Sequence, residues 1–161
     1  MPNIKDVKTD RMRYTKNTIS ANLSYVAIAL NALYFISIYS SDVKSYYYNI
    51  EIGVSVIYNL LFMLFVFLAS EGVKKYDAKY AVLLTVIGAL QIVRIFGIPL
   101  NAYYTFIELR KNQYLQVMES DQFILCIIYL SISAICAIVG GIIGLIKSKK
   151  LAEYEKNLAT E

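Results

Sequence analysis

The sequence predicts an all-α integral membrane protein, and three observations lead to this prediction. Hydrophobic residues make up 58% of the 161 residues and charged residues only 17%, too few to cover a water-soluble domain. Four apolar stretches are each long enough to cross a hydrocarbon core of roughly 30 Å as a helix. None of them alternates in polarity as a barrel strand does. We therefore expect one transmembrane domain over residues 1–161, built as an up-down bundle of four helices.

The first expected span follows a polar tail, residues 1–18. Its apolar run is longer than that of a signal peptide, and no A-x-A-like cleavage site closes it, so we expect an uncleaved helix. A long loop, residues 101–121, separates the third and fourth spans, and a second tail covers residues 147–161. The four spans are expected at Ile19–Tyr39, Ile50–Ser70, Ala78–Leu100 and Gln122–Ile146.

Lysine and arginine residues predict the orientation. Twelve of the 16 lie in the two tails or between the second and third spans. Cytoplasmic loops carry such an excess, so both termini and the middle loop are expected in the cytoplasm, with the plasma membrane of a microbe as the expected location. The basic residues are interpreted as topology signals in preference to a dedicated nucleic-acid or anionic-lipid site, and no nucleic-acid partner is expected.

Small and polar residues mark faces on the first two spans. In the first span, Ser24, Ala27 and Asn31 recur at helical spacing, which is typical of a helix–helix contact. In the second span, Glu51 and Asn59 share about one third of the helix circumference with Ser55 and Tyr58. Both faces are expected to point toward protein, because an unpaired polar group in hydrocarbon is costly.

The third span contains the anomalous residue of this chain, Arg94. An arginine at the centre of a membrane helix costs about 2.5–3.5 kcal/mol, so such a residue is a candidate site by default. The residues of this candidate intramembrane polar site are Arg94, Glu51, Gln91, Asn59, Asn31 and Asp121. Gln91 lies about 60° away on the same face. We expect Arg94 to pair with Glu51 in the outer half of the bundle, with Asp121 as the second choice. Pro99 is expected to kink or end the helix near residues 95–99.

The fourth span carries a row of small residues, Cys136, Gly140 and Gly144. Gly140 and Gly144 form a GxxxG pair, which lets another backbone approach closely, within the chain or between subunits. Beyond this span, Leu151, Tyr154 and Leu158 form an amphipathic stretch that suits the membrane surface or a partner helix.

Tyrosines are expected mainly as an interfacial belt, because 11 of the 15 lie close to a span boundary. No histidine is present, and Cys126 and Cys136 are about 15 Å apart along one helix, too far to bridge. No catalytic residue, metal site or cofactor is therefore expected.

Three classes of function remain. The preferred one is a non-catalytic accessory, regulatory, immunity or scaffold component of a membrane complex, with the lipid bilayer and another membrane protein or a second copy as partners. The alternative is a small oligomeric channel or transporter that uses Arg94. The minor alternative is a membrane-embedded enzyme with Glu51, Glu108 or Asp121 as acid or base.

Overall fold

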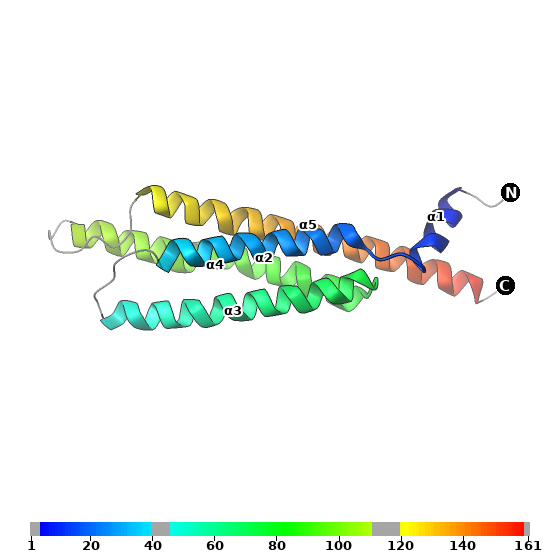
Figure 1. Ribbon diagram of the computed structural model, residues 1–161, viewed down its shortest axis with the longest axis horizontal. Helices are drawn as coiled ribbons and strands as arrows, with labels where there is room; N and C mark the ends of the chain where they lie inside the picture. The colour runs from blue at the N-terminus through cyan, green and yellow to red at the C-terminus, as the bar shows by residue number, and fades with distance from the viewer. Residues whose placement is uncertain (1–3, 40–45, 111–119, 160–161) are drawn as a thin grey trace.

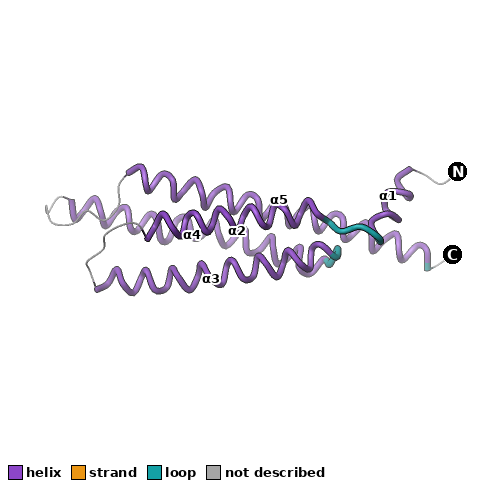
Figure 2. The backbone as a smooth tube through the Cα atoms, in the orientation of Figure 1, coloured by secondary structure: helices purple, strands orange, loops and turns teal. Residues whose placement is uncertain are grey.

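The computed structural model describes the backbone of residues 4–39, 46–110 and 120–159. It describes the side chains of the same residues except 4–6, 38–39, 46–52, 97–110 and 120. Within these ranges the chain is helical and contains no strand (Figure 2). The five helices are α1 (Ile4–Met12), α2 (Thr18–Tyr39), α3 (Tyr46–Lys74), α4 (Ala78–Arg110) and α5 (Ser120–Leu158).

Helices α2 to α5 are each long and apolar enough to cross a membrane, so the structure contains the four long apolar helices that the sequence predicts. They lie side by side along the long axis of the molecule (Figure 1). Each packs against its neighbours in the chain, and α5 also packs against α2, so that the four helices surround one core. Large apolar side chains cover the outside of this assembly, as expected for a surface that faces lipid.

Small and medium apolar side chains from all four long helices fill the middle of the bundle. The main core cluster contains Ala27 of α2, Val66 and Ala69 of α3, Leu84 of α4 and Ala137 of α5. A smaller cluster, Tyr34, Cys126 and Leu130, lies farther toward the α2–α3 connection. The many alanines allow the helix axes to come close together, which is how helices associate in lipid.

The fourth long helix extends farther than the sequence indicated. Instead of ending near Ile146, α5 continues to Leu158 and is 39 residues long, or about 58 Å at helical rise. The residues after Ile146 are mainly Lys, Leu, Ala and Glu, all strong helix formers, so no local signal ends the helix. Helix α1 packs against this extension, and both lie beside the chain termini (Figure 1).

Pro99 does not end the third long helix, because α4 runs through it to Arg110. Of the two alternatives expected near residues 95–99, a kink or an end of the helix, the end was therefore wrong. Membrane helices tolerate proline because neighbouring groups and small local adjustments replace the lost backbone bond. The result is a third helix that includes about half of the loop expected at residues 101–121.

The connection between α3 and α4 is a tight turn with well-defined hydrogen bonds. The N–H of Asp77 donates to the carbonyl of Gly72 at 3.3 Å, and the N–H of Tyr76 donates to the carbonyl of Val73 at 3.0 Å. Tyr76 is left-handed, with φ 58°. This is a Schellman motif, which satisfies the last carbonyls of α3. The Asp77 carboxylate then accepts a hydrogen bond from the N–H of Lys79 at 2.9 Å and caps α4.

Candidate intramembrane polar site

Arg94 lies inside the bundle and is 5% exposed. Its Nη1 donates a hydrogen bond to Oδ1 of Asn31 on α2, with a distance of 3.2 Å. One turn earlier on α4, Nε2 of Gln91 donates to the same oxygen at 3.0 Å. Nδ2 of Asn31 in turn donates to Oδ1 of Asn59 on α3, at 3.2 Å. Asn31 therefore joins α2, α3 and α4 through three hydrogen bonds.

The four side chains of this network, Asn31, Asn59, Gln91 and Arg94, are all buried, and they are referred to below as the polar network. All four were candidate site residues in the sequence. Helical periodicity placed Gln91 and Arg94 on one face, and the structure turns that face toward the polar faces of α2 and α3. Hydrogen bonds between buried side chains in a low-dielectric interior are stronger than in water, so the network favours one rotation of each helix.

Two tyrosines enclose the guanidinium of Arg94. The centre of this group lies 4.6 Å from the ring centroid of Tyr34 and 4.7 Å from that of Tyr58. Both distances are within the range of cation–π attraction, which is stronger for a desolvated cation. The arginine charge is therefore stabilised by aromatic faces from α2 and α3, in addition to the Asn31 oxygen.

Neither Tyr34 nor Tyr58 was a candidate site residue in the sequence, although Tyr58 was placed on the polar face of the second span. Most tyrosines of this chain lie near span boundaries, and these two are among the few that do not. Tyr34 follows Asn31 by three residues and so shares its face of α2, and Tyr58 lies in the same polar third of the second span as Asn59. A tyrosine far from the interface and next to a buried amide was the available signal.

The two acidic candidates are placed differently. The side chain of Glu51 lies outside the described residues, and so does the expected Arg94–Glu51 interaction. Asp121 is exposed in the first turn of α5. In that position a carboxylate interacts favourably with the positive end of the helix dipole.

The small residues expected to support helix packing lie between helices of this chain. Ala27 and Ser24 are buried in α2, and the carbonyl of Ala27 accepts a hydrogen bond from Oγ of Ser133 on α5 at 2.9 Å. A β-carbon added at Gly140 would lie 3.2 Å from Cβ of Leu23 on α2. At Gly144 it would lie 2.9 Å from Cγ1 of Val73 on α3.

The closest approach of α4 and α5 involves two other glycines, Gly88 and Gly141. A β-carbon at Gly141 would lie 2.8 Å from the backbone nitrogen of Thr85, and one at Gly88 would lie 3.0 Å from that of Ile138. Backbone atoms cannot move aside as a side-chain end can. Cys136, the third member of the small-residue row, is half-buried and packs against the main core cluster. Within α5, Gly141 therefore lies closer to the backbone of another helix than Gly140 of the GxxxG pair does.

A second buried amide, Asn17, joins the helices near the termini and was not a candidate in the sequence. Its N–H donates to the carbonyl of Lys74 at 3.1 Å, and its Nδ2 donates to Oγ of Ser20 at 2.8 Å. Its Oδ1 accepts a hydrogen bond from Nζ of Lys147 at 3.0 Å. Asn17 directly precedes α2, a position that asparagine favours and that could have drawn attention to it.

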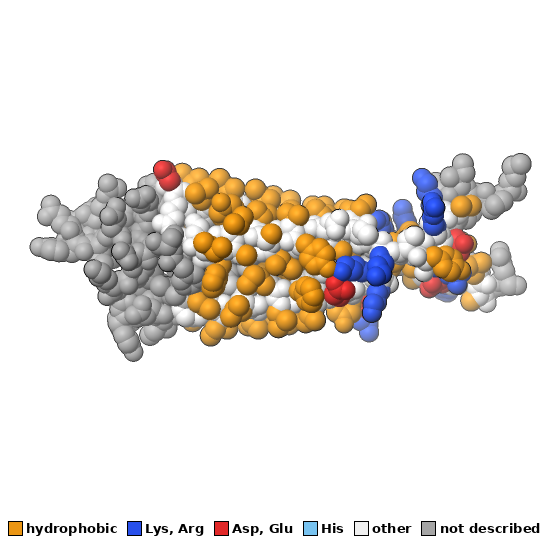
Figure 3. All heavy atoms as spheres, in the orientation of Figure 1, with side chains coloured by type: hydrophobic (Ala, Val, Ile, Leu, Met, Phe, Trp, Pro, Cys, Tyr) orange, Lys and Arg blue, Asp and Glu red, His pale blue; other side chains and the backbone are white. Residues whose placement is uncertain are grey.

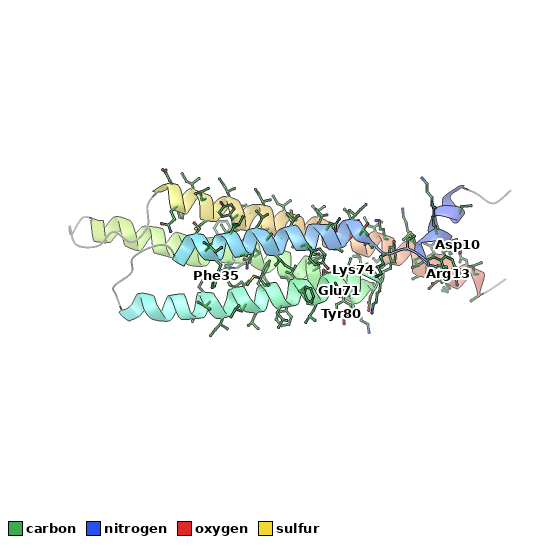
Figure 4. All side chains as sticks on the ribbon, viewed as in Figure 1. Asp10, Arg13, Phe35, Glu71, Lys74 and Tyr80 are labelled. Atoms are coloured by element: carbon green, nitrogen blue, oxygen red, sulfur yellow. The ribbon has the colours of Figure 1, made fainter. Side chains whose placement is uncertain are left out.

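On the outside of the same end, Tyr25 of α2 contacts two charged residues of α3. Its hydroxyl donates to Oε1 of Glu71 at 2.9 Å, and Lys74 donates both to this hydroxyl and to Glu71. Figure 4 shows Glu71 and Lys74 close together near the end of α3. These contacts hold α2 and α3 together where the apolar surface ends.

Within the residues that the structure describes, no group of three or more Cys, Asp or Glu side chains could hold a metal ion. Comparisons of this chain with protein-family models, with curated proteins and with solved structures found no match.

Proposed function

We propose that this protein is a non-catalytic component of a membrane complex, with an accessory, regulatory, immunity or scaffold role. The observation that supports the proposal best is the polar network, in which Asn31 connects side chains from three helices. A network of this kind fixes the rotation and register of the helices. The outer surface that would bind a partner protein is thereby kept in one arrangement. Its members donate to and accept from one another, which favours a structural role over a reacting centre.

The proposed topology is an up-down bundle with both termini and the α3–α4 turn in the cytoplasm of a microbial cell. Its support is the distribution of charge: lysines and arginines gather near the end of the molecule where the termini lie (Figure 3). Cytoplasmic ends of membrane proteins carry this excess.

Association with a partner would then use surfaces other than the GxxxG row. Gly140 and Gly144 already contact Leu23 and Val73 of the same chain. The remaining surfaces are the exposed apolar sides of the bundle, such as that around Val93 and Phe96 of α4, and the projection formed by α1 with the end of α5.

Purification in a mild detergent tests the proposal. We expect one membrane protein, or a second copy of this chain, to co-purify in a fixed stoichiometric ratio, and replacement of exposed Val93 by a photo-crosslinking residue to capture it. A protein that remains a single chain and captures nothing would contradict the proposal.

The second candidate is a small oligomeric channel or transporter, which the buried Arg94 favours because intramembrane charges often mark transport pathways. Liposomes with purified protein separate the two candidates. Conduction or exchange of small ions that disappears in Arg94→Ala would replace the accessory role with transport.

A further inference from the structure

A groove of about 500 Å³ lies beside the termini, outside the polar network. Three segments form it: the chain between α1 and α2, the α3–α4 turn, and the extension of α5. Its volume is within the range of small-ligand sites. The charged residues that line it are Arg13, Lys16, Lys74, Lys75 and Glu155, and Tyr76 lies among them.

The groove carries four cationic side chains and one carboxylate, so its charge is positive. Two of the cations already form ion pairs. Arg13 lies 3.5 Å from Asp10 and 3.8 Å from Glu155, and Lys74 bonds to Glu71. Lys16 and Lys75 are exposed. The ammonium groups of Lys16 and Lys75 can therefore bind an anion without breaking the ion pairs of Arg13 and Lys74.

The position of the groove along the bundle matches the level of lipid headgroups. Lys16 is two residues before the start of α2, and Lys75 directly follows α3. The apolar outer surface ends at this level, and basic side chains begin (Figure 3). Tyr14 and Tyr76 also line the groove, and tyrosine is typical of the membrane interface. Met12 and Leu151 add apolar surface.

We propose that this groove binds the phosphate-bearing headgroup of an anionic phospholipid, with Lys16 and Lys75 as its main charge contacts. Basic pockets at the cytoplasmic ends of membrane helices suit such headgroups. An occupied groove would connect the α1–α2 segment, the α3–α4 turn and α5 through one bound lipid.

Native mass spectrometry of the detergent-purified chain tests the proposal, with phosphatidylglycerol and phosphatidylcholine as probes. We expect phosphatidylglycerol to be retained preferentially. The double variant Lys16→Gln/Lys75→Gln should weaken its binding roughly ten- to thirtyfold. The control variant Lys149→Gln/Lys150→Gln removes the same charge from exposed positions outside the groove and should bind as the unmodified chain does.

A variant that is expected to bind phosphatidylglycerol more tightly distinguishes a loss of lipid contacts from misfolding, because a misfolded chain would not gain affinity. Glu155→Gln removes the carboxylate of the groove and its contact with Arg13, so phosphatidylglycerol should bind about fivefold more tightly. Inorganic phosphate distinguishes a lipid from a soluble ligand, and we expect it not to displace the bound lipid. Equal retention of both lipids, an equal effect of the two double variants, weaker binding in Glu155→Gln, or displacement by phosphate would each overturn the proposal.

Discussion

Asn31 lies at the centre of the polar network. Its side-chain oxygen accepts hydrogen bonds from Arg94 and Gln91, and its nitrogen donates to Asn59. Removing it deprives three buried polar side chains of a partner at once. Asn59, by comparison, takes part in one of these three bonds.

Asn31→Ala is therefore expected to destabilise the bundle more than Asn59→Ala does. Asn31→Ala removes a hydrogen-bond partner from three buried side chains, whereas Asn59→Ala removes one only from Asn31. Each such loss costs between about 0.6 kcal/mol, the mean contribution of an interhelical hydrogen bond in a membrane protein, and about 1–3 kcal/mol where the buried group finds no other partner. Unfolding in mixed micelles with increasing sodium dodecyl sulfate measures both variants. Equal losses would mean that Asn31 is not the centre of the network.

At the scale of the helices, α4 and α5 approach each other closely at Gly88 and Gly141. Gly141→Ala should destabilise the protein by about 1–3 kcal/mol, because the new methyl group would meet the backbone of Thr85 and Ala81 at under 3 Å. Thermal unfolding in detergent measures this change.

Gly53 of α3 provides the matched control for that substitution, because an added β-carbon there has nothing within 4 Å. Gly53→Ala is expected to be neutral or to stabilise the helix by up to about 1 kcal/mol. If both glycine variants behaved alike, the close approach of α4 and α5 would not contribute to stability.

The start of α4 depends on a single carboxylate. Asp77→Ala removes the acceptor for the Lys79 N–H and is expected to cost about 1 kcal/mol. Asp77→Asn retains a side-chain oxygen at the same place and should recover most of the loss. Thermal unfolding of the two variants in detergent provides the comparison, and an Asn variant as unstable as the Ala variant would exclude a capping role.

For the whole molecule, the proposed orientation predicts which sites share a side of the membrane. In a background with Cys126 and Cys136 replaced, single cysteines at Lys75 and Lys149 should react with a membrane-impermeant maleimide only after the membrane is opened. A cysteine at Ser41 should react in intact cells. Labelling of Ser41 and Lys75 from the same side would exclude this topology.

Hydropathy was sufficient to locate the four long helices, because a run of about 20 apolar residues is typical of a transmembrane helix and of few other structures. Periodicity also placed Gln91 and Arg94 on one face. Periodicity within one helix could not reveal that Asn31 would serve both of them, since that depends on the rotation of α2 relative to α4. The length of α5 was missed for another reason: past Ile146 the apolar pattern stops, while helix propensity does not.

The contacts of Asn17 have a consequence for the order of assembly. This residue bonds to Lys147, 130 positions later in the chain, as well as to Lys74. A ribosome delivers α2 long before α5, so Asn17 cannot complete its bonds until the last helix has been inserted. Contacts between distant parts of a chain form late because closing a long loop is entropically unfavourable. The end of the bundle beside the termini is therefore expected to close last, after the α3–α4 hairpin has formed.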